Sequence, residues 1–171
     1  MGLDREMRRA DKKVSDDAWI ADVLRAGQVI HLALATRCGE PYVVPMGYGY
    51  DGAAIYLHGA RHGLKCDIIA DNPKVSFNVT AGVELERSEL GADFSMKYKS
   101  VTGFGEVTEI TDLDGKNAAL GVLMRQYDGP HSDLTEANKD SIWVARIDIM
   151  SVTGKISGYP KPPSQVTRAS S

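Results

Sequence analysis

The chain has 171 residues, a length that favours a single domain. It carries 20 Lys and Arg against 23 Asp and Glu, and the formal net charge of −3 argues against a nucleic-acid-binding protein, whose domain is normally basic. With 43% apolar and 25% charged residues, the composition is that of a globular domain and lies outside the disordered class.

The sequence also bears on compartment and on membranes. No apolar run approaches the roughly 18 residues of a membrane span, and the amino end lacks the apolar middle region of a secretory signal. Cys38 and Cys66 form no Cys-x-x-Cys pair, which favours a reducing compartment over a disulfide framework. We therefore expect a cytoplasmic protein with no membrane partner and no nucleic-acid partner.

The first half of the chain predicts a helix followed by strands. Ser15 is a favourable N-cap and Gly27 a favourable terminator for a helix with apolar residues at helical spacing. Asp51-Gly52 is a strong hairpin signal between two apolar runs. An alternating pattern predicts three strands, at residues 29–36, 41–50 and 53–58.

The second half predicts helices alternating with strands. A loop at 59–63 leads into a short helix that ends before Pro73, and Asp112 is placed to cap a longer helix. Residues 80–96 and 128–140 are polar, and we expect an exposed excursion and a polar loop. The remaining strands are expected at residues 75–79, 98–110 and 141–152.

Together these elements predict one mainly β domain. Consecutive strands with hairpin-length turns indicate an antiparallel barrel with helices outside it or at its ends. We expect an N-terminal arm over residues 1–14, the barrel domain over 15–156, and a flexible tail rich in Pro and Ser over 157–171.

Two patterns resemble known site motifs without the required context. Gly47-Tyr-Gly-Tyr-Asp-Gly52 has the letters of the dinucleotide fingerprint, but a hairpin follows it where that motif needs a helix. His58, His62 and Cys66 have the helical spacing of metal ligands. Two glycines interrupt any helix across them and no fourth ligand is near, so we predict no metal site.

The loop after the third strand is the best candidate site. A strand ends at His58, two glycines follow, and Lys65 lies in the first turn of the next helix. Amides at a helix N-terminus, with Arg61 and Lys65 beside them, make an anion site suited to a phosphate. The alternative is a surface loop with solvated charges.

A second candidate is the strand that begins at Tyr98. Its period of two places Tyr98, Ser100 and Thr102 on one face, and the alternative is a half-exposed strand. No Gly-x-Ser-x-Gly elbow occurs, so a hydrolase has little support.

Several segments, in this order, resemble the pyridoxamine-phosphate-oxidase-like split-barrel proteins that bind flavin nucleotides. Within that family the chain is most similar to the Nim-type proteins, named for 5-nitroimidazole resistance. The similarity extends roughly over residues 5–155. The segments that carry it are Met7-Arg-Arg9, Val44-Pro-Met46, Ile55-Tyr-Leu-His-Gly-Ala60 with Gly63 and Lys65, Asn72-Pro-Lys-Val-Ser-Phe77, Tyr98-Lys-Ser-Val101 with Gly103 and Gly105, and the helix that contains Lys116.

The resemblance implies a six-stranded antiparallel split β-barrel with flanking helices, the FMN-binding split-barrel fold. It further implies a homodimer and an FMN cofactor, with FAD as the alternative, in grooves at the dimer interface. Lys65 and Arg61 would contact the phosphate. The residues that it assigns to the cofactor are Arg8, Arg9, Val44, Pro45, Met46, Gly47, His58, Gly59, Ala60, Arg61, Gly63, Leu64, Lys65, Tyr98, Ser100 and Val101.

For catalysis the resemblance implies a role for His58. In Nim-type proteins a histidine of this segment faces the substrate side of the flavin, where it would orient a small acceptor or supply a proton. The alternative is that His58 only forms a hydrogen bond with the cofactor or the backbone.

Two departures argue against vitamin B6 oxidation. The oxidases proper have an Arg-x-Val-Leu-Leu-Lys segment where this chain has Arg61-His-Gly-Leu-Lys65, and a carboxy-terminal arginine pair where this chain has a Pro-rich tail. We therefore expect an FMN-dependent reductase of a small acceptor, such as a nitroaromatic compound. The alternatives are a flavin-binding or redox-sensing module without turnover, and a haem-binding split barrel.

Glycine is frequent, at 17 of 171 residues or about one in ten, above the average usage of about 7%. Six of these glycines fall in the segments assigned to the flavin groove. We expect them to bring the backbone close to the cofactor. They are Gly47, Gly49, Gly59, Gly63, Gly103 and Gly105.

Overall fold

The computed structural model describes residues 7–166. The strands are β1 (Lys13–Val14), β2 (Ile30–Ala35), β3 (Pro41–Met46), β4 (Tyr48–Tyr50), β5 (Ala54–Gly59), β6 (Lys74–Glu86), β7 (Ser95–Glu109) and β8 (Trp143–Ser157). The helices are α1 (Asp17–Ala26), α2 (Leu64–Asp71), α3 (Leu113–Gln126) and α4 (Pro163–Val166), with short 3₁₀ turns η1 (Ala10–Lys12), η2 (Gly91–Asp93) and η3 (Lys139–Ser141).

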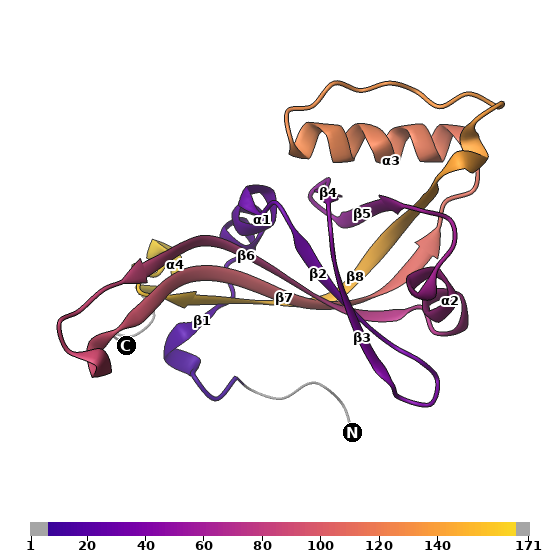
Figure 1. Cartoon of the computed structure of the whole chain (residues 1–171). Coiled ribbons are helices and arrows are strands. Elements are labelled where there is room, and N and C mark those ends of the chain that lie inside the picture. The colour runs from indigo at the N-terminus through magenta and orange to yellow at the C-terminus, as the bar shows by residue number, and fades with distance from the viewer. Residues whose placement is uncertain (1–6, 167–171) are drawn as a thin grey trace.

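All strands belong to one antiparallel sheet that curls into an open barrel (Figure 1). Seven strands follow one another in the order β3-β2-β6-β7-β8-β5-β4, and β1 pairs with β8. The expected mainly β split barrel is therefore confirmed. The expected count of six strands is corrected to seven on this path.

The strand count differs because the strand expected over residues 41–50 breaks at Gly47. Its two halves, β3 and β4, form the two opposite edges of the sheet. At the break the amide of Tyr48 donates to the Tyr127 hydroxyl, which in turn donates to the carbonyl of Gln28. The Tyr48 amide is thus bound to the C-cap residue of α3, and the chain changes direction between β3 and β4.

The core lies inside the curl of the sheet, and α1 covers one end of it. Side chains from alternate strand positions are almost fully buried there, and each such side chain stabilises the fold by about 1.5–3 kcal/mol. Ile20, Val23 and Leu24 of α1 pack on them. The largest side chains of the strands that are less than 2% exposed include Tyr48, Phe77, Ile30, Leu32, Ile55, Leu57 and Ile147.

Helix α3 lies on the outer face of the sheet, across β4 and β5 (Figure 1). It begins as expected at Asp112, whose carboxylate accepts from the amide of Gly115 at 2.7 Å. Leu120 and Leu123 of the helix form a second small core with Val144 of β8.

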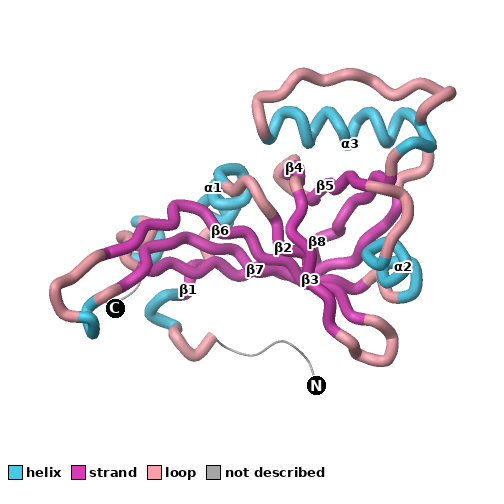
Figure 2. The backbone as a smooth tube through the Cα atoms, viewed as in Figure 1, coloured by secondary structure: helices cyan, strands magenta, loops and turns pink. Residues whose placement is uncertain are grey.

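The expected excursion over residues 80–96 is partly wrong. Strands β6 and β7 continue through it as a two-stranded arm that projects from the barrel (Figure 2). The pairing shifts between Ala81 and Glu84, and Lys97 forms an ion pair with Glu86 at 2.9 Å. Both faces of this arm are largely exposed, including Val83 and Leu85, although these apolar residues alternate with Glu84 and Glu86 as in a strand.

The ends of the described chain lie against the barrel and the arm. Helix α1 is capped by Asp16 and not by the expected Ser15, because the Asp16 carboxylate accepts from the amide of Trp19. Tyr159 donates its hydroxyl to the carbonyl of Gly82, and Ser164 donates to Asp16. The division into an N-terminal segment (1–14), a barrel domain (15–156) and a flexible tail (157–171) stays a prediction.

No helix of residues 7–166 is long and apolar enough to cross a membrane.

The six glycines serve packing more than expected. A Cβ on Gly49 would lie 2.7 Å from the amide nitrogen of Leu123. Because glycine has no Cβ, α3 can approach the sheet closely here. A Cβ on Gly103 would lie 2.2 Å from the Phe77 ring, and one on Gly105 would lie 2.4 Å from the carbonyl oxygen of Asp148. These three glycines make room for the protein itself, which corrects the interpretation that all six face a ligand.

Candidate functional site

The loop between β5 and α2 has the backbone geometry expected of an anion site. Gly63 precedes the helix with φ +122°, a conformation that L side chains rarely adopt. The amides of Cys66 and Asp67 donate to the carbonyl of Gly63, so the helix is formed from its first turn. The preceding helical amides have no intrahelical partner and are available to a ligand.

Lys65 lies among Trp143, Gly59 and Met46, and we call these four residues the Lys65 cluster. Its ammonium nitrogen is 4.8 Å from the centre of the Trp143 ring, and a Cβ added to Gly59 would be 2.7 Å from it. The same Cβ would be 3.8 Å from the end of the Met46 side chain. The fold thus brings three expected residues together, from β3, β5 and α2. Among residues 7–166, Lys65 forms no ion pair with a carboxylate.

Arg61, the second expected cation, is bound to the segment that enters β8. Its Nη1 donates to the carbonyl oxygen of Asp140 at 3.1 Å and to the Asp140 carboxylate at 3.0 Å. Lys65 contacts Trp143, only three positions further along the same segment. Sequence reasoning assigned no role to Asp140 or Trp143, and the one available signal was a large aromatic residue at the start of a strand.

His58 lies on the opposite side of β5 from this cluster. Gly59 pairs with Trp143, and His58 pairs with Val144, which packs under α3. Because side chains alternate across a strand, the exposed His58 imidazole points to the outer face of the sheet, whereas Gly59 adjoins Lys65 on the other face. The structure therefore does not bring His58 and the Lys65 ammonium together on one face.

The expected residues of β3 and β7 divide between two faces of the sheet. Val44 and Met46 pack against the core, whereas Pro45 is exposed on the outer face. Val101 is fully buried in the core, so only its backbone could contact a ligand. Of the remaining expected residues, Gly47 adjoins the Tyr127 hydroxyl, Ala60 accepts a hydrogen bond from Cys66, and Leu64 is exposed.

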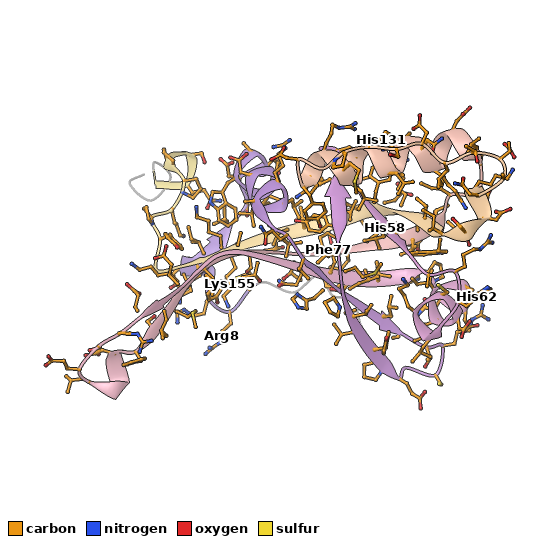
Figure 3. All side chains as sticks on the ribbon, turned by 45° about the horizontal axis from the view of Figure 1, so that its top comes forward. Arg8, His58, His62, Phe77, His131 and Lys155 are labelled. Carbon is orange, nitrogen blue, oxygen red and sulfur yellow. The ribbon has the colours of Figure 1, made fainter. Side chains whose placement is uncertain are left out.

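A second group of expected residues lies elsewhere on the barrel. Arg9 forms an ion pair with Asp11, and this hydrogen-bonded contact lowers the pKa of Asp11 to about 2. The ammonium of Lys155, which is the register partner of Ser100, lies 5.4 Å from the Tyr98 ring. The Arg8 and Lys155 side chains are separated from those of His58 and His62 (Figure 3). Within one chain, the two groups do not form one site.

A polar row on the outer face of the sheet crosses from β3 to β8. The paired positions are, in order, Pro45, His31, Asn78, Thr102 and Thr153. Asn78 donates its amide to the Thr102 hydroxyl at 2.9 Å and to the carbonyl of Val101 at 3.3 Å. Ser76 donates similarly to the carbonyl of Gly103. The expected strands did not reveal this row, because it depends on the register between strands that are distant in the sequence.

A large cleft of about 930 Å³ lies between α3 and the outer face of β5 and β8. Its lining includes Asp51, Tyr56, Arg125 and Arg146. A smaller cleft of about 310 Å³ adjoins it and shares Asp51 and Arg125. Neither of these two clefts is lined by a residue that was expected to bind the cofactor.

Comparison with protein-family models gives one match. A model described as pyridoxamine 5'-phosphate oxidase matches residues 16–156, which include both groups except for Arg8 and Arg9. A search of curated protein sequences found no match.

Several solved structures are similar. A candidate 5-nitroimidazole antibiotic resistance protein from Bacteroides thetaiotaomicron is 26% identical, with a TM-score of 0.75, over 84% of this chain and 86% of that one. An FAD-binding protein from Mesorhizobium loti is 29% identical, with a TM-score of 0.63, over 86% of this chain and 98% of that one. An FAD- and haem-binding protein from Mycobacterium smegmatis shares the fold at 22% identity, with a TM-score of 0.76, over 94% of this chain and 80% of that one.

Proposed function

Because the chain belongs to the pyridoxamine 5'-phosphate oxidase family, we propose that it binds a flavin nucleotide, FMN in the first instance, and reduces a small acceptor with it. The similarity to the FAD-binding protein from Mesorhizobium loti supports the flavin. The similarity to the candidate nitroimidazole resistance protein supports a nitroaromatic acceptor.

The observation that carries this proposal is the environment of Lys65. Its ammonium is half-buried beside a glycine and an aromatic ring, and no carboxylate of the described residues neutralises it. A cation held in this way next to free helix amides fits the phosphate of a nucleotide. The residues present therefore fit the cofactor that the family suggests.

A bound flavin would supply the two-electron chemistry, and the protein supplies binding and orientation. Lys65, Arg61 and the amides that follow Gly63 would hold the phosphate. His58, exposed on the outer face of β5, would orient a small acceptor or donate a proton to it.

The separation of the two residue groups supports a homodimer. Tyr98 and Ser100 pair with the end of β8, at Ser157 and Lys155, whereas Lys65 contacts Trp143 at its start. One nucleotide would therefore contact both groups only if a second copy supplied one of them. We therefore propose that a second copy supplies the other group and that the flavin lies in the groove that the two copies share.

An absorption spectrum of the purified protein tests the cofactor. Bands near about 370 and 450 nm, present as purified or after addition of FMN or FAD and gel filtration, are expected of a flavoprotein. A colourless protein that retains neither nucleotide, or one with a haem Soret band, would overturn the proposal.

Turnover needs a separate experiment. The flavoprotein is reduced without oxygen, a nitroimidazole is added, and the recovery of the 450 nm band is followed against a protein-free flavin blank. Recovery faster than the blank is expected of a reductase. Recovery at the blank rate favours a binding or sensing module.

A further inference from the structure

Within residues 7–166, the Arg61 side chain forms hydrogen bonds with Asp140, 79 positions later in the sequence. One guanidinium nitrogen, Nη1, donates both to the backbone carbonyl and to the carboxylate of Asp140. An arginine has five N–H donors in a rigid planar fork. The contact therefore fixes the plane of the guanidinium and leaves the Nε and Nη2 donors to another ligand.

The backbone around Asp140 is in turn held to α3 by hydrogen bonds from a buried lysine. Lys116 is 1% exposed, and its ammonium donates to the carbonyl of Lys139 at 2.6 Å and to that of Ile142 at 3.2 Å. Asn117, the next residue, forms two hydrogen bonds with the backbone of Leu134. The segment before β8 is thus held from inside, although its surface is exposed.

We propose that Asp140 is a positioning residue that holds Arg61 with its free edge toward the phosphate of the flavin. The inference rests on the proposed function, because it requires that a phosphate binds to the loop between β5 and α2. Lys116 sets the position of Asp140, Asp140 orients Arg61, and Arg61 contacts the ligand.

The charge of Asp140 alone predicts the opposite effect on FMN binding from a positioning role. A carboxylate near a phosphate repels it, so removal of the Asp140 charge would tighten FMN binding if Coulomb interactions decided the outcome. Positioning predicts weaker binding, because a free arginine must be ordered when the ligand binds. The sign of the change therefore distinguishes the two.

The experiment measures the Kd values of FMN and of riboflavin, which lacks the phosphate, by quenching of flavin fluorescence. Asp140→Ala is expected to raise the Kd of FMN about tenfold and to leave that of riboflavin unchanged. Asp140→Asn keeps an oxygen that accepts from Nη1 and is expected to bind FMN at least as tightly as the wild type. In an Arg61→Ala background, Asp140→Ala should cause no further loss.

Asp133→Ala is the matched control, because it removes an equally exposed carboxylate from the same loop, where it pairs with His131. This variant should bind FMN as the wild type does. Unchanged or tighter FMN binding in Asp140→Ala, or an equal loss of riboflavin, overturns the positioning role. A wild-type protein that binds neither FMN nor riboflavin refutes the proposed function instead, which is a distinguishable result.

Discussion

Gly59 is a residue at which one methyl group would alter the candidate site. A Cβ there would lie 2.7 Å from the Lys65 ammonium, which is closer than real Cβ contacts. The atom in the way is the end of a flexible side chain, so the fold can adjust while the ammonium moves away from Trp143. One added methyl group at Gly59 would therefore displace the Lys65 ammonium, which is expected to bind the phosphate.

Gly59→Ala is expected to raise the Kd of FMN about tenfold, because the displaced ammonium no longer faces the phosphate. The melting temperature should change little, since Gly59 lacks a positive φ and no backbone atom obstructs the Cβ. Fluorescence titration and a thermal melt measure the two effects. Gly91→Ala is the control, because a Cβ there meets no atom within 4 Å. Unchanged FMN affinity in Gly59→Ala would contradict the placement of the phosphate at Lys65.

At the scale of elements, the turn between β4 and β5 depends on one carboxylate. Asp51 accepts from the amides of Ala53 and Ala54 at 2.8 Å and from the Tyr56 hydroxyl at 2.9 Å. Desolvation raises the pKa of Asp51, but the hydrogen bonds from Ala54, Ala53 and Tyr56 outweigh it, so the pKa lies below its ordinary value. The charged form therefore stabilises the hairpin that carries Gly59 at its far end.

This lowered pKa predicts acid sensitivity of the hairpin. The unfolded chain binds the proton more tightly than the folded one, so the stabilisation is present above the unfolded pKa of about 3.9 and is lost as the pH falls through the lower folded value. Asp51→Asn should flatten the fall in melting temperature below about pH 4. Melts of both proteins between acidic and neutral pH measure it, with Glu89→Gln on the arm as the control. An equally steep fall in Asp51→Asn would exclude this carboxylate as a source of acid sensitivity.

At the scale of the whole molecule, the expected cofactor residues lie in two separated groups. A site completed by a second copy makes flavin binding depend on protein concentration. Dilution to the monomer is expected to release the flavin, and sedimentation followed at both 280 and 450 nm measures mass and flavin together. A monomer that keeps one flavin per chain would contradict the shared groove.

Local signals explain how much of the fold could be predicted from the sequence. The Asp112 cap, the Asp51-Gly52 hairpin and the start of α2 after Gly63 depend on residues within a few positions of one another, and all are present in the structure. The break at Gly47 and the long arm could not be predicted in this way. The first depends on a hydrogen bond to Tyr127, 79 positions from Tyr48, and the second on pairing between strands whose two faces are exposed.

By itself, the sequence determined the family, the mainly β fold and the loop with its two cations, because order and spacing of short motifs carry that information. Only the tertiary structure decided what each cation contacts. Pairing of β5 with β8 places Trp143 opposite Gly59, so that Lys65 lies over an aromatic ring while Arg61 meets Asp140. These contacts join residues about 80 positions apart, and the register of two distant strands depends on how both bury their apolar faces in one sheet, which neither segment shows alone.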